Sequence, residues 1–225
     1  MPLLGAKFVK TLISNKFFKV MDSIIKSSLN RSITYTYYRN LVKQLVSQND
    51  TTGTEKSENL VAYTKLNDKR MNRWDKTIVI SEPYQAKIKA FNHPITWLVI
   101  VESWCGDAAH VLPVLNKIAE LNNVINLKIV LRDENPELMD AFLTNGARSI
   151  PKLIILDDSS NDVLSTYGPR PSEATNFVSR YKAKYGSLTP EFKEDLQHWY
   201  NNDKGQNVID DITNLLYQLE LNFCQ

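Results

Sequence analysis

The sequence predicts an α/β domain that carries helical extensions at both ends. Two observations support this fold class. From residue 77 onward, short apolar runs alternate with helical segments, which is typical of strands joined by crossover helices. Before that point and after residue 186, helical periodicity dominates. We therefore expect three parts: an N-terminal helical extension (residues 1–76), a central domain (77–186) and a C-terminal helical extension (187–225).

Composition limits the class of protein. The 225 residues are 43% hydrophobic and 23% charged, which is typical of a globular protein. A net charge of +2 is too small to indicate a nucleic-acid partner. No apolar run approaches the roughly 20 residues that a membrane-spanning helix needs. The two cysteines, Cys105 and Cys224, make no disulfide scaffold and suit a reducing compartment, so we expect a cytoplasmic protein.

Residues 6–28 are basic and amphipathic, with apolar pairs about every four positions. This spacing predicts a helix. Packing on the domain or on a partner is the favoured interpretation, together with the alternative that Met21 is the true start. Contact with an anionic membrane surface is the weaker interpretation. The stretch is a poor secretory signal, because lysines interrupt its apolar core and no small-residue cleavage site follows.

Further helices are expected upstream of the central domain, at 32–47 and 57–74, with a polar loop at 48–56 between them. The second helix is locally basic around Arg70, and a solvated helix surface explains this better than a nucleic-acid face. Residues 77–80 form either an edge strand or an extended lead-in to the next helix.

In the central domain, the alternation predicts parallel strands linked by crossover helices, followed by one antiparallel hairpin. The expected strands lie at 96–101, 127–131, 150–156 and 163–167, and the expected helices at 84–91, 104–121, 136–144 and 172–184. Two further helices, at 189–200 and 206–221, make up the C-terminal extension.

A single thiol lies where a buried strand turns into a helix. Cys105 is at the helix N-terminus, whose positive end stabilises a thiolate. Asp107 opposes this effect by like-charge repulsion, or instead caps the first turn. Its near neighbours on the helix, Ala108 and Ala109, provide no second thiol. An isolated cysteine of this kind is either a nucleophile or a small core residue.

The other titratable groups give no metal site, because no histidine has metal-ligand spacing with a cysteine. His110 lies about 140° round the helix from Cys105, so it is no obvious base for the thiol. We expect His110 to be a structural or surface histidine. It lies three residues from Asp107 and could pair with it. Glu102, at the end of the strand, is expected to be an exposed loop carboxylate.

Ile150-Pro151 is the second informative place. A proline at the start of an apolar strand cannot donate to the hydrogen-bond ladder, so it requires a structural reason. A cis peptide bond is one such reason, and a plain strand entry is the alternative.

Together, these motifs resemble the thioredoxin superfamily over roughly residues 77–185. The Trp-Cys-Gly sequence at 104–106 resembles the start of the family's Trp-Cys-Gly-Pro-Cys segment. Pro113 falls where the family kinks the following helix, and Gly168 falls where the family has a glycine after its last strand. The segment at 146–156 resembles the cis-proline strand. The resemblance implies a thioredoxin-like mixed sheet flanked by helices, with Ile150-Pro151 in the cis form close to the Cys105 sulfur.

The departures from the family pattern fall at the site itself. Ala108 replaces the resolving cysteine, Asp107 replaces the active-site proline, and Val99 replaces the buried acid of many members. A dithiol cycle is therefore not available to this chain alone. What remains is a monothiol site, Trp-Cys-Gly-Asp-Ala, in which Asp107 belongs to the supporting residues.

Two functions follow from the resemblance. In the first, the protein is a monothiol thiol-disulfide oxidoreductase: Cys105 attacks a protein or low-molecular-weight disulfide, and glutathione or another small thiol resolves the adduct without a bound cofactor. Trp104 would flank the site, Gly106 would help to stabilise the thiolate, and Ile150-Pro151 would form the docking edge. In the second, the protein is a redox-inactive protein- or peptide-binding module that uses the same groove. Resolution by Cys224, or cluster binding, is a minor alternative.

Overall fold

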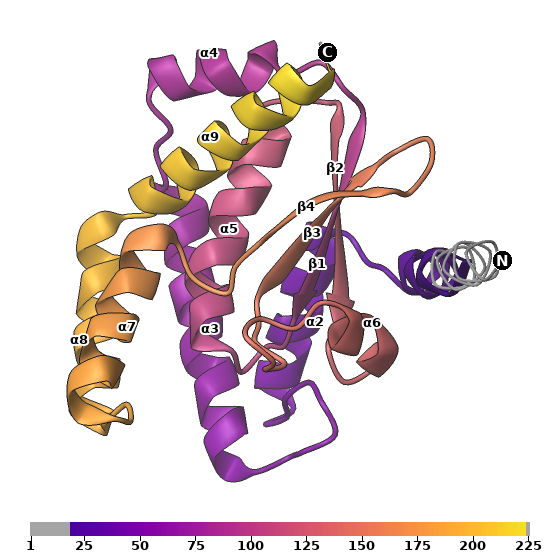
Figure 1. Ribbon diagram of the computed structural model, residues 1–225. Coiled ribbons are helices and arrows are strands. Elements are labelled where there is room, and N and C mark those ends of the chain that lie inside the picture. Colours follow the sequence, from indigo (N-terminus) through magenta and orange to yellow (C-terminus); the bar gives the residue numbers. More distant parts are fainter. Residues whose placement is uncertain (1–18, 224–225) are drawn as a thin grey trace, which may run out of the picture.

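The computed structural model describes residues 19–223, which form a mixed sheet flanked by helices (Figure 1). The strand order is β2-β1-β3-β4. Strands β1 (Ile95–Val101) and β2 (Ile125–Leu131) are parallel. Strand β3 (Lys152–Asp157) is antiparallel to β1, and β4 (Val163–Tyr167) is antiparallel to β3. The α/β fold class and the closing hairpin are confirmed.

One strand direction differs from the expectation. The alternation of elements predicts parallel strands, yet β3 runs antiparallel to β1. The physical reason is the short helix α6 (Pro136–Ala141) between β2 and β3. Its six residues rise only about 9 Å, whereas a seven-residue strand is about 23 Å long, so the helix cannot carry the chain back along the sheet. As a result, β3 begins where β1 ends.

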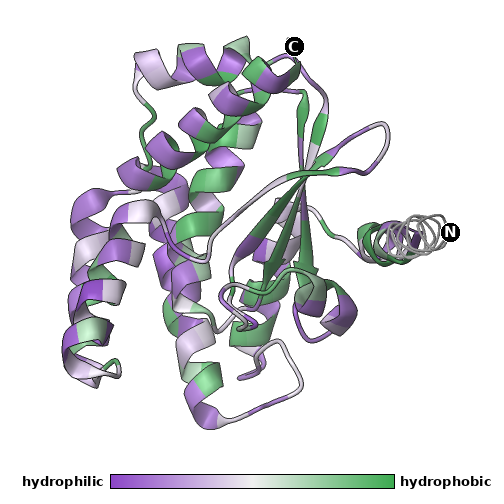
Figure 2. Cartoon of the chain, in the orientation of Figure 1, coloured by the Kyte–Doolittle hydropathy of each residue, from purple (hydrophilic) through white to green (hydrophobic). Residues whose placement is uncertain are grey.

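Strand β1 is the centre of the core. All seven of its residues are buried, which explains the continuous apolar run in the sequence. Figure 2 shows the strands as mostly hydrophobic and the helices as mixed. Helix α5 (Gly106–Glu120) follows β1 directly and contains Pro113. In Figure 1, α3, α5 and α9 lie on one side of the sheet, and α6 and the helix at residues 19–30 lie on the other.

Among the described residues, four helices precede β1. After the helix at 19–30 come α2 (Tyr35–Ser47), α3 (Glu58–Thr77) and α4 (Glu82–Ala90). Helix α2 begins later than expected, because residue 33 pairs with β2 and the Thr34 side chain caps the helix at Tyr37 N. Helix α3 continues to residue 77, so the next three residues are an extended lead-in and not a strand. Residues 6–18 of the expected amphipathic helix lie outside the described residues.

The C-terminal helices are α7 (Ser172–Tyr185), α8 (Pro190–Asp203) and α9 (Gln206–Phe223). Helices α7 and α8 share a small core of their own, whereas α9 joins the main core together with α2 and α3. The boundaries proposed between the three parts of the chain remain predictions. Between residues 19 and 223, none of the helices combines the length and apolar character that a membrane crossing requires.

Candidate functional site

Cys105 occupies the N-cap of α5, immediately after the turn that ends β1. Its backbone N–H donates to the Glu102 carbonyl at 3.1 Å, which closes the turn. The side chain is buried, with 8% of the residue exposed. Its Sγ–H group donates to the Ile150 carbonyl at 3.3 Å, and the Ile150-Pro151 bond is cis. The expected juxtaposition of the thiol and a cis proline is therefore confirmed.

Gly168 packs closely against the backbone of Pro151. It has a φ of +105°, and a Cβ at this position would overlap the Pro151 carbonyl oxygen. Only glycine therefore fits here without a shift of the Gly168 segment or the Pro151 segment. The end of β4 is thus pressed against the start of β3, next to the thiol.

The electrostatic environment keeps the thiol protonated. Burial raises the pKa of Cys105 to about 12, and the charge of Asp107 acts in the same direction. The backbone N–H groups of Ala108 and Asp107 at the start of α5, together with Arg170, lower it. The sequence correctly indicated stabilisation by the helix N-terminus and repulsion by Asp107. It did not reveal that burial is the largest effect and outweighs the stabilisation of the thiolate by the helix N-terminus.

Asp107 joins α5 to the C-terminal extension. Its Oδ2 atom lies 2.7 Å from Arg170 Nη2, and its Oδ1 atom accepts a hydrogen bond from the Tyr200 hydroxyl at 2.9 Å. Its side chain is only 12% exposed, and burial raises the pKa of its carboxyl group. Asp107 is therefore an anchor for Arg170 and α8, and none of its hydrogen bonds in the structure caps the helix.

His110 is the buried structural histidine that the sequence allowed, but it does not pair with Asp107. Its Nδ1 atom accepts from Trp74 Nε1 at 2.9 Å, so its Nε2–H donates to Gln197 Oε1 at 2.8 Å. Its ring is stacked on Tyr200, with 4.2 Å between the centroids. Burial lowers the pKa of His110 to about 3, so the ring is neutral near pH 7.

Glu102 was expected to be exposed, and this prediction is wrong. The residue is fully buried; Oε1 accepts from the Asp133 N–H at 2.9 Å, and Oε2 has no partner among the described residues. Burial raises the pKa of its carboxyl group. Beside it, Trp104 is half-buried under the Arg132 guanidinium, 4.8 Å from the ring centroid.

A pocket of about 400 Å³ opens over the thiol. It brings together four of the six predicted site residues, at positions 104–107, whereas Ile150 and Pro151 are not part of its lining. Its other walls are α3 and the segment from 188 to 197, which come from the two extensions. The lining cations are Arg70, Arg170 and Lys193.

Sequence reasoning missed these cations and Gln197. The sequence around Arg70 is typical of a solvated helix face, and no local pattern marks Arg170, Lys193 or Gln197 as site residues. The only available signal was that the extensions are long enough to cover the domain.

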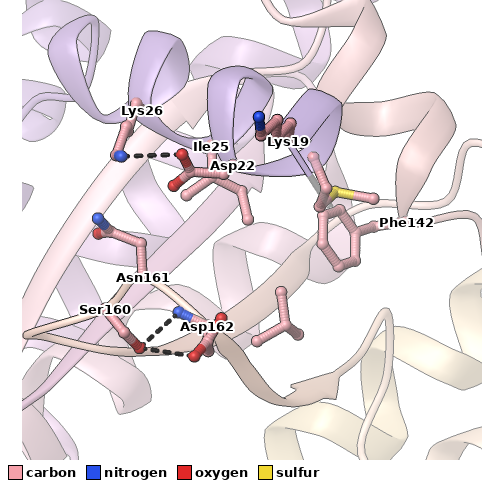
Figure 3. Close-up of a pocket in the computed structure, with 10 residues that line it drawn as sticks. Lys19, Asp22, Ile25, Lys26, Phe142, Ser160, Asn161 and Asp162 are labelled. Carbon is pink, nitrogen blue, oxygen red and sulfur yellow. Dashed lines mark hydrogen bonds and ion pairs between the residues drawn. The ribbon is translucent and has the colours of Figure 1, made fainter. Parts of the chain in front are cut away.

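A second pocket, of about 760 Å³, is larger but contains none of the predicted site residues. Figure 3 shows it between the helix at 19–30, the end of α6 and the turn of the β3–β4 hairpin. Lys26, one of its lysines, pairs with Asp22 at 2.8 Å, and Asp162 accepts from Ser160 Oγ at 2.9 Å. We therefore place the candidate site at the smaller pocket, which contains the thiol.

A mixed sheet with a thiol at the start of α5 and a cis proline beside it defines a thioredoxin-fold protein. A thioredoxin family model matches residues 53–184, more than half of the chain, and the chain belongs to this family. The match includes α3, one wall of the pocket.

Two solved structures are similar. A protein of unknown function from Pseudomonas aeruginosa has a TM-score of 0.54 and 17% identity, and the match covers 70% of this chain and 90% of that one. An HIV epitope scaffold has a TM-score of 0.50 and 14% identity, and the match covers 78% and 97% of the two chains. At these identities, the likeness shows the fold alone. No curated protein matches the chain.

Proposed function

We propose that this protein is a thioredoxin-fold binding protein that takes a small ligand in the pocket over Cys105 and is redox-inactive. The observation that carries the proposal is the state of the thiol. Cys105 is buried, and its Sγ–H is engaged with the Ile150 carbonyl. Because burial raises the pKa of the thiol to about 12, very little of it is ionised at neutral pH. Since the thiolate is the nucleophile, attack on a disulfide is strongly disfavoured.

The position of the two extensions supports a binding role. Leu60 and Tyr63 of α3 form one wall of the pocket, and Leu196 and Gln197 of α8 form another. These walls restrict the approach of a folded protein to the thiol, while they leave space for a small molecule or a short chain end. Helices from both extensions thus form part of the pocket that contains the thiol.

Monothiol exchange is the second candidate, and the cis proline beside the sulfur favours it. In this reaction, the Cys105 thiolate attacks one sulfur of a disulfide, the other sulfur leaves as a thiolate, and the thiol proton passes to solvent. An external thiol such as glutathione then attacks the mixed disulfide and releases Cys105. A protein disulfide or a low-molecular-weight disulfide would be the substrate.

Alkylation of Cys105 as a function of pH separates the two candidates. The Cys224→Ser variant is used, so that Cys105 is the only thiol. The binding proposal predicts slow reaction with iodoacetamide, an apparent pKa well above the value of about 8.5 for an ordinary thiol, and no adduct with oxidised glutathione by intact mass.

The same protein in urea provides the control, because the exposed thiol should then react with an ordinary pKa. An apparent pKa at or below about 8.5, together with a mixed disulfide that reduced glutathione removes, would overturn the binding proposal in favour of exchange.

A further inference from the structure

We infer that the pocket over Cys105 binds a small organic acid with an apolar body, whose carboxylate is held by Arg70. This inference rests on the proposed function, because it names the ligand class of the same pocket. The pocket combines hydrogen-bond donors with apolar walls.

Arg70 is a half-buried cation held in a fixed position. Its Nη1 atom donates to Asn67 Oδ1 at 2.9 Å, and the fully buried Asn67 donates in turn to the Ser103 carbonyl at 2.9 Å. Among the described residues, no carboxylate forms an ion pair with Arg70. The nearby Asp107 is already bound to Arg170 and Tyr200. A partly desolvated guanidinium of this kind is stabilised by a bound anion, and its planar fork matches a carboxylate.

Gln197 adds a second donor at the same place. Trp74 donates to His110, so His110 must donate to Gln197 Oε1, and the amide NH₂ group of Gln197 is directed away from the histidine. A Cβ built on Gly106 would lie 3.6 Å from Arg70 Nη1 and 4.0 Å from Gln197 Nε2. The two donors thus converge over the first residue of α5. Lys193, on the same wall as Gln197, adds a further positive charge.

The polar lining therefore consists mainly of donors. Among the described residues, Asp107 is the one carboxylate that lines the pocket, and it is already paired with Arg170, so the ligand must supply the acceptors. The remaining walls are apolar and include Leu60, Leu188 and Leu196. A volume of about 400 Å³ lies within the range of about 300–1,000 Å³ that is usual for small-molecule pockets. Charge complementarity thus selects an anion, and the apolar walls select one with a hydrocarbon or aromatic body.

A pair of fluorescent probes tests the inference on the full chain. Anilinonaphthalene sulfonate is an apolar anion, and phenylnaphthylamine is an uncharged analogue. We expect the anion to bind more tightly than the neutral dye. Octanoate should displace the bound anion, whereas octylammonium and inorganic phosphate should not. Octanoate should also slow the alkylation of Cys105 in the Cys224→Ser variant, which locates the binding site at this pocket.

The variants are matched in charge and in position. Arg70→Gln should weaken binding of the anionic dye by at least about tenfold and leave the neutral dye within about twofold. Lys69→Gln removes the same charge from the adjacent, exposed position of α3 and should have little effect. Lys193→Gln provides a second test, with a smaller loss, if Arg70→Gln does not fold.

Several results would overturn the inference: equal losses in Arg70→Gln and Lys69→Gln, displacement by octylammonium as effective as by octanoate, or binding without protection of Cys105. These outcomes are separate from those for the proposed function. A reactive thiol would refute redox inactivity and leave the preference for anions intact. An unreactive thiol without that preference would refute only the ligand class.

Discussion

Replacing Asp107 by asparagine tests how the thiol is kept protonated. Burial is the largest cause of the raised pKa of Cys105, and the Asp107 charge is the next. Removing the charge alone should lower the apparent pKa of the thiol, and Arg170, no longer neutralised, acts in the same direction. Because burial is unchanged, the pKa should remain above about 8.5. The expected value thus lies between that of an ordinary thiol and about 12.

The same substitution also destabilises the fold. It breaks a 2.7 Å ion pair in which the aspartate is 12% and the arginine 25% exposed, and Arg170 Nε is already buried without a partner among the described residues. A charged hydrogen bond in such a setting contributes about 2 kcal/mol. For a chain of this length, that corresponds to a decrease in Tm of about 4–8 °C.

The assay is the rate of iodoacetamide alkylation from about pH 6 to pH 10, in the Cys224→Ser background. Asp195→Asn is the control, because it removes an exposed acid from α8 outside the pocket lining. Two results would refute the reasoning while the variant remains folded. If the pKa does not change, the Asp107 charge does not act on the thiol. If it falls to an ordinary value, burial is not the main cause.

Two further predictions concern the frame around the site. Burial lowers the pKa of His110 to about 3 in the folded state. Between about pH 6.5 and pH 3, therefore, His110 binds a proton in the unfolded chain but not in the folded one. The free energy of unfolding should therefore fall between about pH 6.5 and pH 3, by at most about 5 kcal/mol; urea-unfolding profiles parallel to those of His110→Phe would contradict this. Gly168→Ala forces a Cβ against the Pro151 carbonyl and should cost more than about 2 kcal/mol in the same assay, whereas Gly146→Ala, also at positive φ but in open space, should cost about 1 kcal/mol. Equal losses would argue against the close approach at residue 168.

The sequence predicts the parts of the site that local patterns specify. The apolar run of β1 and the turn before α5 place Cys105 at a helix N-terminus, because these features depend on neighbouring residues alone. The closeness of Cys105 and Ile150-Pro151 is not a local pattern, because the two are 45 residues apart in the sequence. The family resemblance linked them. That resemblance gave the correct location of the thiol relative to the proline.

The properties that decide function depend on packing from remote segments. Glu102 lies at a strand end that normally faces solvent, and its burial follows from the surrounding fold. Arg70 belongs to a helix with many charged residues, and its sequence context resembles a solvated surface. The balance of effects on the Cys105 pKa was likewise beyond sequence reasoning, because the sign of each effect was visible but the degree of burial was not.

The contacts that hold α8 against α5 and α3 also build one wall of the pocket. Tyr200 binds Asp107 at the start of α5, Gln197 binds His110 one turn later, and Asn201 accepts a hydrogen bond from Arg73 of α3 at 2.6 Å. Movement of α8 away from α5 would widen the pocket over the thiol. That movement would remove the Gln197 donor and the adjoining apolar wall. Under the proposed function, ligand binding therefore requires α8 to stay against α5, and Tyr200, Gln197 and Asn201 are the residues that hold it there.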